Sequence, residues 1–324
     1  LLLAKPGIAV NQAATDDGAT PLYVAACNGH HDVVRLLLAK PGIAVNQAKT
    51  DDGATPLYVA ACNGHYDVVR LLLAKPGIAV NQATTDDGAT PLYVAAQEGY
   101  RDVVQLLLAK PGIAVNQAAT DDGTTPLSVA AQEGYRDVVQ LLLTDPEIQV
   151  NKFDFEHQTA LFVAAKNNQI DCLKLLFGQL YIDPNIPDTN GNTPLIEAAS
   201  RGFFDCVETL LNNTFEEKLF INPILQANCR TFMLCNKPKP DAAYTIPTQI
   251  IQYIFNIFQK TTDIDKKNNQ GETAVFVAAA NGHFNCVRIL LQYGCNKTLA
   301  NNQNQTPLDV ANQRNDNLCK ELLK

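Results

Sequence analysis

Apolar residues stand in short runs along this chain, and turn-forming residues close each run. Residues 16–42 read DDGATPLYVAACNGHHDVVRLLLAKPG, in which the largely apolar runs LYVAA and VVRLLL are separated by an Asn-Gly break and followed by Pro-Gly. This pattern predicts a pair of short helices. The first runs from Leu22 to Asn28, and the second carries the VVRLLL run as far as Leu38.

Four residues indicate where these helices begin and end. Thr20 is a natural N-cap because its hydroxyl accepts a hydrogen bond from a free backbone N–H group, and Pro21 suits the first helical position because it has no N–H to leave unpaired. Gly29 suits the end of the first helix, and Gly18 suits a turn that needs a positive φ. Neither helix reaches the length of about 12 residues that an isolated helix needs in water, so each is expected to depend on its neighbours.

The same pattern returns at a fixed interval. The threonine before each first helix recurs 35 residues apart in the first four copies and 34 apart in the next two, and after a jump of 80 residues it recurs twice more. The eight positions are Thr20, Thr55, Thr90, Thr125, Thr159, Thr193, Thr273 and Thr306. A fixed period in this range is typical of a solenoid, in which each repeat is stabilised by stacking on the next.

The repeated motif resembles that of the ankyrin repeat family. The family pattern G-x-T-P-L-x-x-A-A-x-x-G-[HY]-x-x-V-V-x-L-L-L stands at residues 18–38 and three more times in the following copies. The resemblance implies an all-α repeat solenoid of helix-turn-helix units joined by β-hairpin loops. One departure is that Tyr23 stands where the family usually has a histidine after Thr-Pro-Leu.

The jump of 80 residues predicts an insertion between repeats. We expect ankyrin repeats over residues 1–212, beginning with a truncated first repeat, an insertion over residues 213–262, and two C-terminal repeats over residues 263–324. Within the insertion, residues 246–258 read IPTQIIQYIFNIF, an apolar stripe at helical spacing. This stretch resembles the opening helix of an F-box, and an amphipathic helix packed on the solenoid explains the same stripe.

Differences between the near-identical copies point to a candidate binding surface. Copies one and two differ at two of 35 positions, and copies two and three differ at six. The resemblance implies that the residues after the Ala-Ala pair and those at the hairpin tips face a concave groove where partners bind. These residues are Asn28, Asn63, Gln97, Glu98, Gln132 and Glu133 at the helix ends, and Lys49, Thr84 and Ala119 at the tips. Recent duplication explains the near-identity equally well.

An acidic pair at each tip does not vary among the first four copies. The pairs are Asp16 and Asp17, Asp51 and Asp52, Asp86 and Asp87, and Asp121 and Asp122. Stacked repeats would set these carboxylates side by side as a ladder that fits a basic segment of a protein partner. The alternative is that each aspartate caps its own turn and stays solvated, which needs no partner.

Composition narrows the choice of partner and compartment. The chain has 33 acidic and 25 basic residues and a net charge of −8, which argues against nucleic acid because neutralising phosphate needs clustered Lys and Arg. No uninterrupted apolar stretch approaches the roughly 20 residues that span a bilayer, so no membrane contact is expected. The nine cysteines show no CxxC spacing, which favours a reducing, cytoplasmic compartment.

The sequence offers little chemistry. It holds no Gly-rich phosphate loop and no G-x-S-x-G or H-E-x-x-H motif, so neither catalysis nor a cofactor is expected. Cys27 with His30, and Cys62 with His65, invite a zinc interpretation. Both histidines follow a helix-ending glycine, however, where the ankyrin family places them for structural hydrogen bonds, so no metal is expected.

These observations predict a monomeric, non-catalytic scaffold that binds another protein through the concave groove. Three alternatives remain open. One is a substrate adaptor of a ubiquitin ligase, acting through the F-box-like helix at 246–258. Another is an effector that an intracellular microbe secretes into the host cytosol to act on host proteins. An enzyme whose catalytic domain flanks the array is a third.

Overall fold

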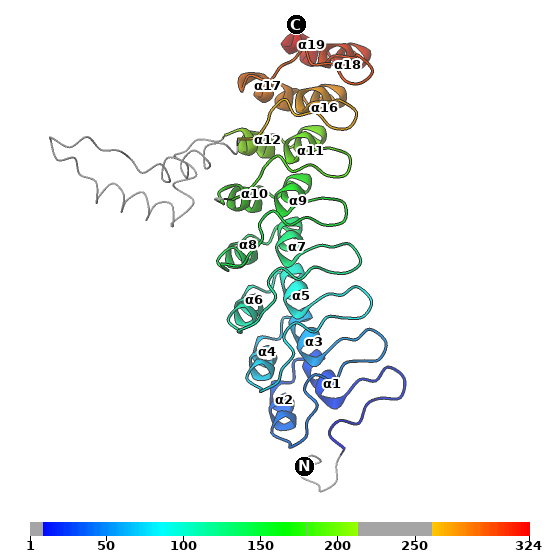
Figure 1. Cartoon of the computed structure of the whole chain (residues 1–324), viewed down its shortest axis with the longest axis vertical. Coiled ribbons are helices and arrows are strands. Elements are labelled where there is room, and N and C mark those ends of the chain that lie inside the picture. Colours follow the sequence, from blue (N-terminus) through cyan, green and yellow to red (C-terminus); the bar gives the residue numbers. More distant parts are fainter. Residues whose placement is uncertain (1–8, 180, 213–260) are drawn as a thin grey trace, which may run out of the picture. The chain divides into compact units, whose positions relative to one another are not determined.

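The computed structural model of the chain describes residues 9–179, 181–212 and 261–324. Over these residues it forms sixteen α-helices and no regular strand, and the helices follow one another as eight pairs (Figure 1). The chain divides into two compact units, Leu1–Phe155 and Glu156–Lys324. The eight helix pairs confirm the eight copies that the threonine spacing predicts.

Each unit holds four helix pairs. The helices of the first unit are α1 Pro21–Cys27, α2 His31–Leu38, α3 Pro56–Cys62, α4 Tyr66–Leu73, α5 Pro91–Gln97, α6 Arg101–Leu108, α7 Pro126–Glu133 and α8 Arg136–Leu142. The helices of the second unit are α9 Ala160–Lys166, α10 Ile170–Phe177, α11 Pro194–Arg201, α12 Phe204–Leu211, α16 Ala274–Asn281, α17 Phe284–Gln292, α18 Pro307–Gln313 and α19 Asn317–Leu323.

The first helix of each pair begins as the sequence predicts. The Thr20 hydroxyl accepts a hydrogen bond from the Tyr23 N–H at 3.1 Å, and Pro21 is the first helical residue. The equivalent threonine caps its helix in all eight copies. Helix α1 ends at Cys27, one residue earlier than predicted, and Gly29 follows at φ +69°. The caps are therefore a local property of the repeated sequence.

Small and branched apolar residues form the core within each unit. Ala25 is 4 % exposed, and Leu22 and Ala26 are fully buried on α1. Because alanine projects only a Cβ, successive first helices such as α1, α3 and α5 come close and pack in a row. The second helices α2, α4, α6 and α8 pack in a parallel row, in which Val34 and Leu37 are buried. Helices of seven to nine residues are stable here because both rows bury them.

The tips between repeats are closed turns. Lys49 N–H donates to the Ala54 carbonyl at 3.0 Å, which closes one tip. The next residue, Thr50, donates its N–H to the Asp17 carbonyl of the preceding tip at 2.9 Å. The hairpin shape implied by the ankyrin resemblance is thus present, although the described residues contain no regular strand at the tips.

An asparagine joins each repeat of the first unit to the next. Asn46 Nδ2 donates to the Gly77 carbonyl at 2.7 Å, and its Oδ1 accepts from the Ala79 N–H at 2.9 Å. The same pair of bonds is made by Asn11, Asn81 and Asn116 in their copies. Each side chain satisfies two backbone groups of a neighbouring repeat, so it acts as a polar staple between repeats.

Stacking in the second unit continues from one side of the expected insertion to the other. Helix α11 packs on α16, and α12 packs on α17. Asn268 Nδ2 lies 3.0 Å from Asn192 Oδ1, and Asn281 Nδ2 donates to the Ser200 carbonyl at 3.0 Å. The repeat therefore resumes its stacking after the jump of 80 residues. The F-box-like stretch at 246–258 lies outside the described residues.

Candidate protein-binding surface

The second aspartate of each tip holds the turn. Asp17, Asp52, Asp87 and Asp122 each accept a hydrogen bond from the backbone N–H two residues further on, at 2.7–3.0 Å. The glycine between them takes a positive φ, as at Gly53 with φ +72°. For these four carboxylates, the turn-capping alternative weighed above describes what the side chain does.

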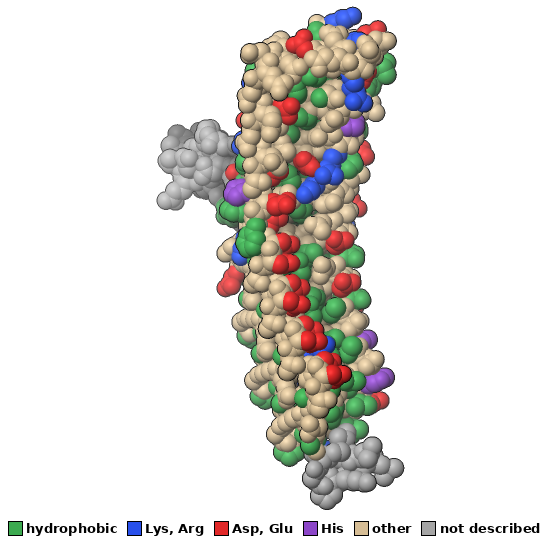
Figure 2. Space-filling view, turned by 90° about the vertical axis from the view of Figure 1, so that its right-hand side faces the viewer, with side chains coloured by type: hydrophobic (Ala, Val, Ile, Leu, Met, Phe, Trp, Pro, Cys, Tyr) green, Lys and Arg blue, Asp and Glu red, His purple; other side chains and the backbone are tan. Residues whose placement is uncertain are grey.

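The first aspartate of each tip faces solvent. Asp16, Asp51, Asp86 and Asp121 are all exposed, and 52 % of the Asp51 side chain is accessible. Viewed from the side of the hairpin tips, acidic side chains follow one another in a row along the first unit (Figure 2). The four exposed carboxylates, which we call the tip aspartates, are the part of the predicted ladder that is available to a partner.

Lys49 belongs to this surface as an internal counter-charge. Its Nζ lies 3.0 Å from Asp51 Oδ2, 3.5 Å from Asp17 Oδ2 and 3.7 Å from Asp52 Oδ2, and only 15 % of the side chain is exposed. The hydrogen bond that the Lys49 ammonium donates to Asp51 raises the pKa of Lys49 and lowers the pKa of Asp51. Lys49 thus neutralises one end of the acidic row instead of presenting a free positive charge.

Three tyrosines on the first helices are affected by the carboxylates of the tips. Burial raises the pKa of Tyr23 to about 12, with the Lys49 ammonium opposing this shift and Asp52 and Asp51 adding to it. Burial is also the main cause that raises the pKa of Tyr58 and of Tyr93. The second cause is a carboxylate of the next tip, which is Asp87 for Tyr58 and Asp122 for Tyr93. These residues take the place of the family's histidine, and the Tyr23 ring has the Lys49 ammonium over it, 5.6 Å from the ring centre.

The predicted helix-end residues differ in how freely they are presented. Asn28 Nδ2 and Asn63 Nδ2 each donate to the carbonyl four residues earlier in their own helix, at 2.8 Å in both copies. In copies three and four the equivalent positions, Gln97 with Glu98 and Gln132 with Glu133, are exposed. Asn28 and Asn63 are exposed too, but each is bonded to its own helix, and Gln132 Nε2 donates to Glu133 Oε1 at 3.0 Å.

A column of rings and glycines, which sequence reasoning did not foresee, joins the second helices to the preceding repeat. The His65 ring lies against Gly29, where an added Cβ would be 2.8 Å from the ring, and His65 Nε2 is 2.9 Å from the Cys27 carbonyl. Tyr100 and Tyr135 lie in the same way against Gly64 and Gly99. The structural role expected for His65 is confirmed. The signal in the sequence was an aromatic ring one residue after each helix-ending glycine.

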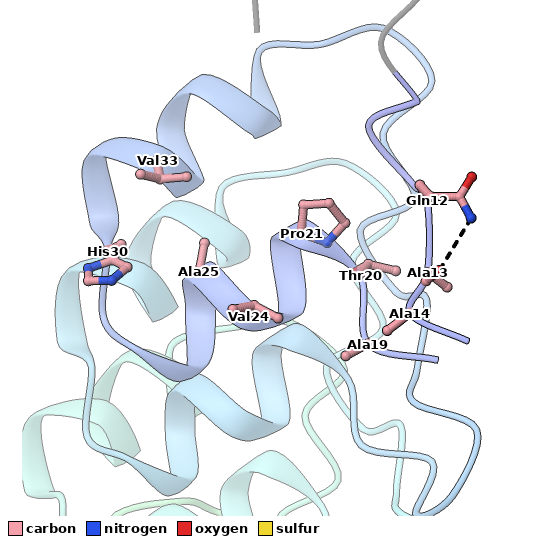
Figure 3. Close-up of a pocket in the computed structure, with 10 residues that line it drawn as sticks. All are labelled: Gln12, Ala13, Ala14, Ala19, Thr20, Pro21, Val24, Ala25, His30 and Val33. Atoms are coloured by element: carbon pink, nitrogen blue, oxygen red, sulfur yellow. Dashed lines mark hydrogen bonds between the residues drawn. The ribbon is translucent and has the colours of Figure 1, made fainter. Parts of the chain in front are cut away.

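An open hollow of about 550 Å³ lies on the first helix pair, with Val24 on α1 and Val33 on α2 among its lining residues (Figure 3). Val24 and Val33 are 48 % and 42 % exposed. Their counterparts Val59 and Val68 are 7 % and 1 % exposed, because in the next copy the preceding repeat covers this face. The hollow is therefore a repeat-stacking face, and its lining is largely apolar, with Gln12, Thr20 and His30 as its polar residues.

The described residues hold few groups suited to chemistry. Across residues 9–179, 181–212 and 261–324, no group of three or more His, Cys, Asp and Glu side chains is placed to hold a metal ion. Burial raises the pKa of Cys206 to about 12 and that of Cys286 to about 11, so neither thiol forms a reactive thiolate at neutral pH. No helix in this part of the chain combines the length and the apolar character that a bilayer crossing needs.

Fold and surface together define a helical-repeat solenoid whose tips carry a row of acidic side chains. The sequence profile described as ankyrin repeats (3 copies) matches residues 1–84, 78–154, 146–219 and 242–324. The chain therefore belongs to the ankyrin repeat family, which confirms the resemblance seen in the motif. Ankyrin repeats are typically non-catalytic and generally mediate binding to other proteins.

Two curated proteins share stretches of this sequence. Synphilin-1 of Mus musculus is 28 % identical over 76 residues, which is 23 % of this chain and 8 % of that protein. A putative ankyrin repeat protein of Rickettsia bellii (strain RML369-C) is 35 % identical over 54 residues, which is 17 % of this chain and 32 % of that protein. The similarity thus spans a minor part of either relative's length.

Proposed function

We propose that this chain is a non-catalytic scaffold that binds a basic segment of another protein along the acidic tips of its first four repeats. In this proposal the chain acts as a monomer in the cytoplasm, and its partner is not a nucleic acid. The net charge of −8 supports the sign of the partner's segment. The ligase-adaptor and microbial-effector interpretations rest on residues 246–258 and on copy near-identity, and they stay predictions.

The proposal rests on the tip aspartates, which are exposed and are held by the same backbone geometry from one tip to the next. Consecutive tips are joined by the same backbone hydrogen bond, at 2.9 Å from Thr50 to Asp17, 2.8 Å from Thr85 to Asp52 and 2.7 Å from Thr120 to Asp87. Like charges held next to one another repel. The first aspartates of three tips accept only the adjacent backbone N–H, from Asp17, Asp52 and Asp122 respectively, and keep their exposure. A cationic segment that runs along the row would relieve this repulsion and meet the carboxylates in register.

The test removes charge from the tips and keeps their turns. The variant carries Asn at Asp16, Asp51, Asp86 and Asp121, because asparagine retains turn-forming and local hydrogen-bonding capacity. A partner is first isolated with the intact array, and its association rate is then measured with both proteins at low and at physiological salt. The proposal predicts a slower association for the variant and a weaker dependence on salt, since screening acts over about 8–10 Å.

A matched control separates this surface from total charge. The control carries Asn at Asp32, Asp67, Asp102 and Asp137, four exposed aspartates in the first turns of the second helices. It loses the same four charges away from the tips, so it should keep most of the association rate. Equal effects in the two variants would contradict the proposal. Unchanged binding in a folded tip variant would move the interface to Gln97, Glu98, Gln132 and Glu133, or to the insertion.

A further inference from the structure

Lys49 shows how the tips hold a cation, because its own ammonium is seated among their carboxylates. The Nζ atom lies 3.0 Å from Asp51, 3.5 Å from Asp17 and 3.7 Å from Asp52, and 5.6 Å from the centre of the Tyr23 ring. We call this arrangement of three carboxylates from two successive tips, with a tyrosine ring beside them, a cradle. Charge-assisted contacts and the face of the ring both favour an ammonium at its centre.

The cradle recurs in the next two pairs of repeats. The second cradle consists of Asp52, Asp86, Asp87 and Tyr58, and the third of Asp87, Asp121, Asp122 and Tyr93. The backbone bond between tips is 2.9 Å long in the first cradle and 2.8 Å and 2.7 Å long in the others, so the frame is the same. The residues of the later cradles stand 35 and 70 positions after those of the first, so each occupies the same place in its repeat.

The second and third cradles lack an internal cation. The position of Lys49 is taken by Thr84 in the second cradle and by Ala119 in the third. Within the described residues, no Lys or Arg forms an ion pair with Asp86, Asp87, Asp121 or Asp122. The Thr84 hydroxyl donates to Asp87 Oδ1, whereas Ala119 offers no polar atom from its side chain. Asp121 and Asp122 are both exposed, so the third cradle is the more open of the two.

We propose that the second and third cradles each bind a lysine side chain of the partner, while Lys49 fills the first cradle from within. This inference rests on the proposed function, and it adds which residues bind each lysine and how the lysines of the partner are spaced. Helices packed in a row lie about 8–10 Å apart, and a polyproline II segment advances about 9 Å over three residues. Lysines at every third position of an extended segment therefore match successive cradles.

The test uses two synthetic peptides of identical composition and the intact chain. One peptide carries three lysines at every third position, separated by neutral residues, and the other carries the three lysines side by side at one end. Affinity is measured by fluorescence anisotropy at physiological salt. The spaced peptide should bind more tightly, by about fivefold for each cradle that it engages beyond the clustered one.

Filling and opening the cradles gives the decisive comparison. The filled variant, Thr84→Lys with Ala119→Lys, should lose binding of the spaced peptide and gain thermal stability, because its own ammonium groups occupy the sites. The opened variant, Lys49→Thr, should bind the spaced peptide about fivefold more tightly. The control, Gln105→Lys with Gln140→Lys, adds the same charge on the second helices, at positions where copies one and two carry Arg35 and Arg70. It should bind nearly as the unaltered chain does.

Two outcomes would overturn the inference. One is equal binding of the spaced and the clustered peptide to the unaltered chain. The other is equal loss in the filled and the control variants, which would reduce the effect to long-range charge. If either occurred while the isolated partner still depended on the tip aspartates, the cradles would be rejected and the proposed function would stand. If the partner ignored the tip aspartates as well, both would fall.

Discussion

Tyr100 lies directly on Gly64 of the preceding repeat, so closely that an added Cβ at Gly64 would be 2.6 Å from Tyr100 Cε1. No side chain fits at this distance without moving the ring. Gly64 also takes φ +68°, which residues other than glycine adopt only with strain. Two independent requirements, one on space and one on backbone, thus meet at a single glycine.

Gly64→Ala is expected to destabilise the array by about 2–4 kcal/mol, the sum of about 1 kcal/mol of backbone strain and the cost of displacing Tyr100. Gly77→Ala is the matched control, because Gly77 takes φ +77° and has no atom within 4 Å of an added Cβ. It should cost only the strain. Denaturant unfolding of both variants makes the comparison, and equal losses would contradict the close contact.

Asn46→Ala should loosen the join between copies one and two. The change removes both bonds of the staple, to the Gly77 carbonyl and the Ala79 N–H, and should cost about 1–3 kcal/mol. Hydrogen exchange gives a local readout, because the Ala79 amide loses its acceptor and should exchange faster. Gln47→Ala serves as the neighbouring control, and an Ala79 amide as protected as before would count against the staple.

Two valines at the same place in successive copies should respond differently to truncation. Val68 is 1 % exposed and Val33 is 42 % exposed. Val68→Ala removes two buried methyl groups and should cost about 2 kcal/mol, whereas Val33→Ala should cost less than about 1 kcal/mol. The change in helix propensity is the same in both variants, so it cancels in the comparison. Similar costs in thermal unfolding would show that the Val33 face is covered.

Asp316 should stabilise the last helix in a way that depends on pH. It caps α19 by accepting from the Leu318 and Cys319 N–H groups at 3.1 Å, and the bond from Cys319 lowers its pKa. A carboxylate whose folded pKa lies below its unfolded value of about 3.9 contributes fully above that value, and the contribution is lost as pH falls through the folded pKa. Asp316→Ala should therefore cost about 1 kcal/mol at pH 7 and progressively less below about pH 4.

Glu321→Ala is the control for this pH dependence, because it removes an exposed carboxylate from the same helix. Its effect should stay within about 0.5 kcal/mol of zero at each pH. Both variants are measured by thermal unfolding between about pH 2 and pH 7, because carboxyl groups titrate within this range. A cost for Asp316→Ala that is independent of pH would contradict the charged cap.

Features that depend on neighbours in sequence were predictable from the sequence. The threonine caps, the glycine turns and the period of the array all follow from residues a few positions apart, and the structure confirms each of them. His157 and Asn304 stand where other copies have a turn glycine, and they too take left-handed backbone, at φ 64° and 58°. Asn168 and Asn315 adopt the same conformation at helix ends, where the sequence had not singled them out.

Contacts between repeats were harder to foresee, because they join residues more than 30 positions apart. The staple from Asn46 to Gly77 spans 31 residues, and the bond from His65 to Cys27 spans 38. The ion pair of Lys49 with Asp17 could not be predicted from the sequence of one repeat, because Asp17 belongs to the preceding tip. Side chains that act between repeats are placed by the stacking, which the pattern of one repeat does not contain.

Zero-length cross-linking tests the central claim most directly. A carbodiimide joins a carboxylate to a lysine amine only where the two are in contact, and mass spectrometry then identifies the linked residues. In the complex with an isolated partner, we expect cross-links from Asp86 and Asp121 to lysines of one extended partner segment, because Lys49 already occupies Asp51. Cross-links confined to Asp32, Asp67, Asp102 and Asp137 on the second helices, in a complex that forms normally, would contradict binding at the acidic tips.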